Sequence, residues 1–130
     1  MPHYHAVVWM DHAEAKVFEF AGEITERKHV RNPNDAQVHH KAGVIGPGKA
    51  GASDPFFKEV ATAVADAHEI LIMGPASAKL EFQRYLHKHA PVVEAKVIGI
   101  ETADHPTDAQ VLAHARTRFH AVDRMRPQIQ

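Results

Sequence analysis

The sequence predicts an α/β domain built on a mixed five-stranded sheet with the strand order 3-2-1-4-5 and helices on its faces. Three closely spaced apolar runs lie in the first 31 residues, and two later apolar runs alternate with helical patterns. A chain of 130 residues is long enough for one domain with a core and too short for two. We therefore treat residues 1–130 as a single domain.

The N-terminal part of the chain predicts an antiparallel meander. β-branched and aromatic residues dominate 4–10 and 15–20, and a more polar run follows at 24–30. The connections between these runs are too short for a crossover helix, so neighbouring strands must be antiparallel. Charged residues on the third run, such as Arg27 and Lys28, are typical of an edge strand.

The stretch 32–53 has little apolar periodicity and contains two prolines and four glycines. We expect a flexible glycine-rich loop here. A structureless loop of about 20 residues inside a compact domain is usually either functional or disordered.

Helical and strand patterns alternate after this loop. Ser53 or Asp54 caps a helix that ends near residue 67, and the continuous apolar run 69–73 is typical of a strand covered on both faces. Gly74 and Pro75 end that strand, and a second helix begins at residue 77 or 78.

The C-terminal part repeats this alternation. Pro91 closes the second helix, and a further strand is expected at 95–100. Thr107 opens the last helix with Gln110 in a near capping box, and the tail 123–130 is expected to fray. The order is β-β-β-α-β-α-β-α. Right-handed crossovers make the last two strands parallel to the first, which is the ribonuclease H-like arrangement.

This order of elements, the stretch ILIMGPASAKLEFQRYL at 70–86, and a glycine-rich loop that leads into a Phe-containing helix resemble a known group. They are similar to the central domain of archaeal and eukaryotic peptide-release factors and of the ribosome-rescue protein Pelota. In that group the corresponding strand ends in a small-residue turn before a Lys-bearing helix start, as Gly74, Pro75 and Lys79 do here. The resemblance implies a translation-associated protein with the ribosome, ribosomal RNA or transfer RNA as partner.

One departure limits what the resemblance implies. Release factors carry Gly-Gly-Gln before the first long helix, and the equivalent stretch here, KAGVIGPGKAGASDPFF at 41–57, lacks it. Hydrolysis of peptidyl-tRNA is therefore not expected.

The composition excludes several classes. Fifteen Lys and Arg residues nearly balance 16 Asp and Glu residues, so any attraction to nucleic acid must be local. The absence of cysteine excludes a disulfide framework and a thiolate nucleophile, and it suits a cytoplasmic protein. No signal-peptide pattern and no apolar run of membrane-spanning length are present, so we expect no membrane association.

The strongest candidate anion site is the glycine-rich loop. His39, His40, Lys41 and Lys49 lie among glycines and precede a helix N-terminus, and such backbone and ammonium groups hold phosphate oxygens. The alternative is a flexible surface loop with incidental charge.

Two further candidates flank other elements. Ser77 and Lys79 follow a strand end where ligands bind in α/β sheets, but Gly74-Pro75 is favoured as a structural corner. Arg116 and Arg118 lie on the last helix, where basic residues also complement the helix C-terminus.

Metal chemistry has weaker support. Asp11 ends the first strand, where ribonuclease H-like nucleases place a metal-binding carboxylate, but it is also a common turn residue. The fourth strand ends without an acid, and Glu101, Asp104 and Asp108 complete a site only if they approach Asp11. His3 and His5 share one face of a strand, but two imidazoles do not make a metal site without a third ligand, and the histidine pairs on the helices diverge. We therefore expect solvated histidines and neither metal nor cofactor.

The interpretation that best fits these patterns is a non-enzymatic, translation-associated protein that binds ribosomal or transfer RNA or ribosomal components. The alternatives are a metal-dependent nuclease centred on Asp11 and a dimeric adaptor without a nucleic-acid role. The sequence leaves the oligomeric state open.

Overall fold

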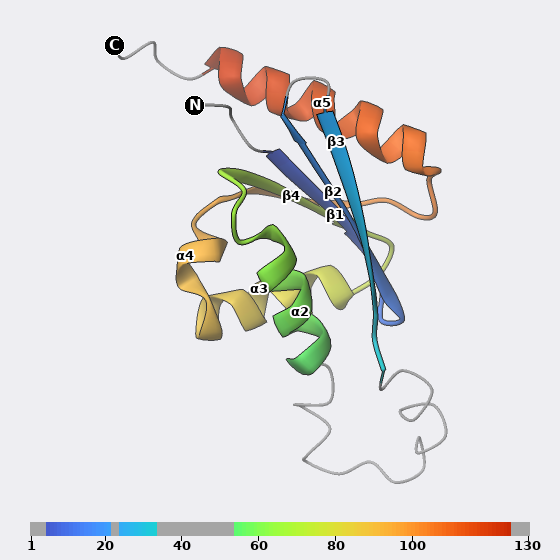
Figure 1. Ribbon diagram of the computed structural model, residues 1–130, viewed down its shortest axis with the longest axis vertical. Helices are drawn as coiled ribbons and strands as arrows, with labels where there is room; N and C mark the ends of the chain where they lie inside the picture. Colours follow the sequence, from blue (N-terminus) through green and yellow to red (C-terminus); the bar gives the residue numbers. More distant parts are fainter. Residues whose placement is uncertain (1–4, 22–23, 34–53, 126–130) are drawn as a thin grey trace, which may run out of the picture.

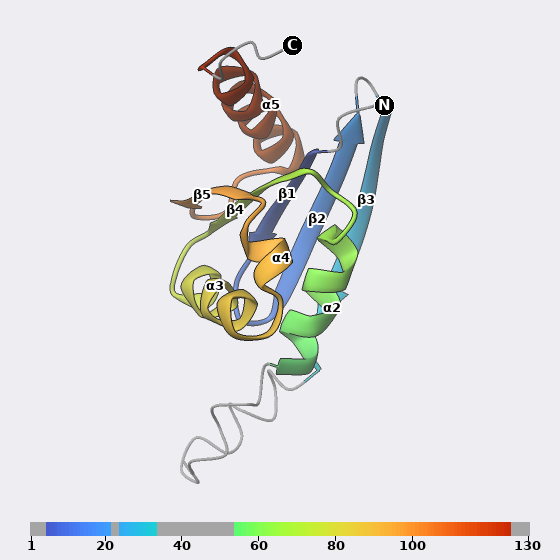
Figure 2. The same cartoon turned by 90° about the vertical axis from the view of Figure 1, so that its left-hand side faces the viewer.

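The computed structural model describes residues 5–21, 24–33 and 54–125. Its centre is a five-stranded sheet with the order β3-β2-β1-β4-β5, as predicted (Figure 1 and Figure 2). The strands are β1 (His5–Met10), β2 (Glu14–Ala21), β3 (Ile24–Arg31), β4 (Glu69–Gly74) and β5 (Val97–Thr102). β1, β2 and β3 form the antiparallel meander, and β4 is parallel to both β1 and β5. β3 is an edge strand, as predicted.

Helices cover both faces of the sheet and give three layers. On one face lie α2 (Asp54–Val64), α3 (Ala78–His89) and the short α4 (Pro91–Glu94), and on the other face lies α5 (Asp108–Met125) (Figure 2). We call these the α2–α4 face and the α5 face. None of the helices in the described ranges is long and apolar enough to cross a membrane.

The apolar run of β1 is explained by this double coverage. Val8 and Met10 belong to the core on the α2–α4 face, whereas Val7 and Trp9 belong to the core on the α5 face. All six residues of β4 are buried for the same reason. Side chains alternate between faces along a strand, so a strand covered on both sides needs a continuous apolar run.

The strand β5 differs from its prediction. We expected a strand at 95–100, but β5 begins at Val97, and its residues are half-buried or exposed. Ala95 and Lys96 are held in a turn by bonds from their N–H groups to the carbonyls of Pro91 and Val93. β5 is the last strand of the sheet on this side, so no strand among the described residues pairs with its outer edge.

Several helix boundaries also differ from the predicted ones. α2 ends at Val64, earlier than residue 67, and α5 continues to Met125, past the expected start of fraying at residue 123. Pro91 ends α3 as predicted but also begins α4, because proline suits the first turn of a helix. At Thr107 the capping box is reciprocal: Gln110 N–H donates to Thr107 Oγ1 over 3.1 Å, and Thr107 N–H donates to Gln110 Oε1 over 2.8 Å.

Gly74 is required by a close approach of two strands. A Cβ atom on Gly74 would lie 2.2 Å from the carbonyl oxygen of Met10, which is backbone and cannot move aside. The Gly74-Pro75 break is therefore a structural corner at the end of β4.

Candidate nucleic-acid interface

Cationic side chains cover aromatic rings on the α5 face. The guanidinium of Arg116 lies 4.7 Å from the ring centroid of Phe20, and that of Arg27 lies 5.8 Å from the centroid of Phe18. Lys16 Nζ lies 5.8 Å from the ring of Trp9. The three rings are only 1–4% exposed. α5 covers part of this aromatic surface, and the aliphatic stems of the cations cover more of it.

Arg27 belongs to a basic row along β3. Residues at two-residue spacing share one face of a strand, and Arg27 and Arg31 therefore lie on the same side of β3 as Thr25. The register places Arg27 opposite Phe18 and Arg31 opposite Glu14. Both arginines are exposed.

Hydrogen bonds and ion pairs hold the cations in place. Arg116 Nη2 donates to Thr25 Oγ1 over 3.0 Å and so joins α5 to β3. Asp108 in the first turn of α5 lies 3.4 Å from Lys16 Nζ and 3.7 Å from Arg27 Nη1. Its carboxylate also complements the N-terminus of the helix.

Four basic side chains lie together on this surface. We define the cationic face as Lys16, Arg27, Arg31 and Arg116. Two carboxylates, Asp108 and Glu14, lie beside these four cations. Lysine and arginine side chains are the groups that most often contact phosphate in proteins.

The structure separates the two predicted arginines of the last helix. Arg116 lies on the cationic face, but Arg118 points to the opposite flank of α5, where its Nε donates to Glu101 Oε2 on β5. Its guanidinium lies over Gly99, where a Cβ would lie 2.7 Å from Arg118 Nη2, the flexible end of that side chain. The role of Arg118 in binding stays a prediction.

Glu101 is held by two partners on α5. His114 Nε2 lies 2.5 Å from Glu101 Oε1, and Arg118 binds the other oxygen. Partial burial raises the pKa of Glu101, but the hydrogen bonds and charges of Arg118 and His114 outweigh burial and leave this pKa below its usual range. The cluster pins α5 to β5.

Ser77 and Lys79 lie on the α2–α4 side and are engaged within the protein. Ser77 Oγ donates to Glu81 Oε2 over 3.1 Å, and Lys79, only 7% exposed, donates to the carbonyl of Ala76. A phosphate contact at this corner stays a prediction. The other predicted anion contacts, His39, His40, Lys41 and Lys49, lie outside the described residues.

Asp11 shapes a turn. Its Oδ1 accepts hydrogen bonds from the N–H groups of Ala13 and Glu14 over 2.8 and 3.0 Å. Glu101, Asp104 and Asp108 pair with basic or histidine side chains instead of approaching Asp11. Within the described ranges, no group of three or more His, Asp or Glu side chains could hold a metal ion.

Several histidines pair with carboxylates, which the sequence did not predict. Besides His114 with Glu101, four such pairs connect different parts of the described chain: His5 with Glu69, His12 with Glu81, His29 with Glu14, and His87 with Glu94. Partners that are distant in the chain cannot be found from spacing along a single helix or strand.

Sequence reasoning missed the contributions of Lys16, Arg27 and Arg31 to the interface. It treated the charges of β3 only as protection of an edge. The two-residue spacing of Arg27, His29 and Arg31 was the available signal, since it predicts one shared basic face.

No protein-family model matches this chain, and no curated protein matches it either. Solved structures do share its fold. Pelota of Thermoplasma acidophilum is 22% identical, with a TM-score of 0.61 over 89% of this chain and 32% of its own. Pelota of Archaeoglobus fulgidus is 14% identical, with a TM-score of 0.63 over 91% and 32%. An archaeal translation termination factor, aRF1, is 16% identical, with a TM-score of 0.54 over 94% and 39%.

This chain thus spans 32–39% of the length of these proteins. The chain has the fold found in Pelota and aRF1, as the resemblance predicted.

Proposed function

We propose that this protein is a non-enzymatic, translation-associated protein that binds ribosomal or transfer RNA through the cationic face. The observation that carries this proposal is the placement of Arg27 and Arg116 over buried aromatic rings, with Lys16 and Arg31 beside them. Cations fixed over rings lose little further freedom when they bind phosphate, which favours a built contact surface over scattered surface charge.

The fold supports the translation setting. aRF1 is a translation termination factor, and Pelota shares the same architecture. The sequence lacks the Gly-Gly-Gln that the resemblance links to peptidyl-tRNA hydrolysis, so the proposed role is binding without hydrolysis. We propose the ribosome as the partner and the cytoplasm as the location.

The glycine-rich segment is proposed as a second contact. Residues 34–53 follow β3 directly in the chain, and β3 carries Arg27 and Arg31. Lys41 and Lys49, with His39 and His40, would extend the basic surface toward the same partner.

Co-sedimentation with ribosomes at low and high salt tests the proposal. Wild type is compared with Arg27→Gln/Arg116→Gln, which removes two cations of the face, and with Lys58→Gln/Lys88→Gln. The second variant makes the same charge change at exposed positions on α2 and α3. We expect retention by wild type and the α2/α3 control at low salt, and loss by the Arg27/Arg116 variant.

Equal retention of all three proteins would show that the cationic face does not contribute to ribosome binding. Retention of none would favour the dimeric adaptor, which sedimentation equilibrium would then test. Cleavage of RNA with magnesium or manganese, abolished by Asp11→Asn, would favour the nuclease instead.

A further inference from the structure

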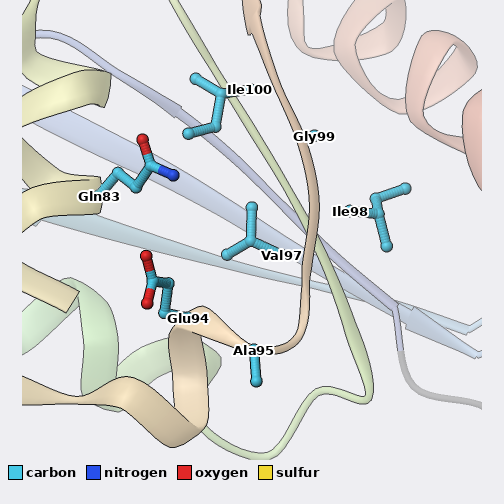
Figure 3. Close-up of a pocket in the computed structure, with 7 residues that line it drawn as sticks. All are labelled: Gln83, Glu94, Ala95, Val97, Ile98, Gly99 and Ile100. Atoms are coloured by element: carbon cyan, nitrogen blue, oxygen red, sulfur yellow. The ribbon is translucent and has the colours of Figure 1, made fainter. Parts of the chain in front are cut away.

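The edge of the sheet farthest from β3 borders a groove. The depression has a volume of about 490 Å³ and is lined by residues of α3, α4 and β5 (Figure 3). Its lining residues are Gln83, Glu94, Ala95, Val97, Ile98, Gly99 and Ile100. We call it the β5 groove.

The side chains divide the groove into an apolar floor and a polar rim. Val97 and Ile100 point toward α3, on the side where Gln83 and Glu94 lie, whereas Ile98 points to the other side of the strand (Figure 3). The depression therefore wraps around the outer edge of β5. Leu80, 44% exposed, lies one turn before Gln83 on α3 and extends the apolar surface.

The outer edge of β5 is open to a further strand. β5 ends the sheet on this side, so within the described chain no strand pairs with its outer edge. The register irregularity between Ile70 and Leu71 affects the start of β5, and regular pairing with β4 continues from Gly99 to Thr102. An edge strand beside a helix is the geometry in which extended peptides add a strand to a sheet.

The charge of the groove indicates which peptide fits. Glu94 is the acidic residue of the lining, and its side chain is 26% exposed, with His87 Nδ1 3.0 Å from Oε1. A carboxylate at the rim of an apolar groove favours a segment with a lysine or arginine next to apolar residues. A second copy of this chain fits less well, because β5 contains Glu101 and no basic residue.

We infer that the β5 groove binds an extended segment of a partner protein, which adds a strand to β5. An apolar side chain of that segment packs on Val97 and Ile100, and a basic side chain pairs with Glu94. The groove lies at the opposite end of the sheet from β3, so this inference goes beyond the proposed RNA contact and does not depend on it.

The test uses a fluorescein-labelled peptide in which lysine and valine alternate at every second position, with threonine between them, so that both lie on one face of the extended strand. Binding is followed by anisotropy. A peptide with the same composition in separate lysine and valine blocks controls for charge alone. A third peptide is alternating but carries backbone N-methyl groups, which remove the donors needed for strand addition.

We expect the alternating peptide to bind wild type and both control peptides to bind at least about tenfold more weakly. Glu94→Gln should weaken the alternating peptide about five- to tenfold. Val92→Ser, a change at a 72% exposed apolar residue of α4 outside the lining, should not alter its affinity.

Three results would overturn the inference: no binding of the alternating peptide, equal binding of the N-methylated peptide, or equal affinity for wild type and Glu94→Gln. The Arg27→Gln/Arg116→Gln variant should bind the peptide like wild type. Loss of peptide binding in that variant would likewise contradict an independent groove.

Discussion

The two faces of the sheet are completed in different ways. On the α2–α4 face, apolar side chains of three helices pack against apolar strand residues. On the α5 face, one helix supplies Val111, Ala115 and Phe119, and cationic stems cover part of the aromatic surface. The same residues therefore bury the core and present charge, which is how a nearly neutral chain obtains a local basic surface.

The largest expected effect on stability concerns Gly74, at the corner that ends β4. Gly74→Ala should cost more than about 4 kcal/mol of unfolding free energy, because its Cβ would lie 2.2 Å from Met10 O. Urea unfolding measures this loss. Gly99→Ala is the matched control, since its one close contact would be with the flexible end of Arg118, and about 1 kcal/mol or less is expected. Equal stability of the two variants would contradict the requirement for glycine at position 74.

The core of the α2–α4 face should affect stability without affecting binding. Phe82 is fully buried there, and Phe82→Ala should cost about 3–4 kcal/mol by leaving a cavity. RNA affinity, measured at a temperature where the variant is folded, should equal that of wild type. A loss of affinity in the folded variant would mean that the two faces are coupled.

The α2–α4 face also contains a buried carboxylate, Glu19. The cation beside it, Lys28, neutralises this carboxylate and covers no aromatic ring among the described residues. Lys28 Nζ lies 3.0 Å from Glu19 Oε1 and 3.2 Å from the carbonyl of Ala63, and Glu19 is 4% exposed. Lys28→Met should cost about 2 kcal/mol in thermal unfolding, because it leaves this charge buried without its partner. Adding Glu19→Leu should restore most of the loss, and failure to do so would argue against the pair.

The smallest effect on stability concerns the far flank of α5. The pKa of Glu101 is lowered in the fold, so its contribution is present above the usual pKa of the carboxyl and is lost as the pH falls through the lowered value. Wild type should be more stable than Glu101→Gln at pH 7 by less than about 1 kcal/mol. This difference should shrink between about pH 5 and pH 3. A pH-independent difference in chemical unfolding would contradict the role of the charge.

The fold was largely predictable from sequence because its signals are local. Double coverage explains the continuous run of β4, and the loop lengths of the meander force antiparallel pairing. The position of β5 was harder to predict, because Val97 to Ile100 are as apolar as a central strand although they lie at an edge. Pro91 was ambiguous, since proline both ends one helix and begins the next.

The candidate site was predictable only in part. Arg116 was found from the basic end of the last helix, but its neighbours Lys16 and Arg27 come from β2 and β3, about 90–100 residues earlier in the chain. Arg118, two residues from Arg116, points to the other flank because neighbours at that spacing diverge around a helix. The contacts between charged side chains depend on how strands and helices pack. Local sequence patterns do not predict this packing.

The salt dependence of RNA binding tests the central claim most directly. Phosphate contacts release counterions, so the logarithm of affinity for a single strand falls with the logarithm of salt by about 0.7 per contact. For a uridine oligonucleotide, the slope for Arg27→Gln/Arg116→Gln should be shallower than that of wild type by about 1.4, and Lys58→Gln/Lys88→Gln should keep the wild-type slope. Equal slopes for all three proteins, or an equal reduction in both variants, would contradict a phosphate-binding role for the cationic face.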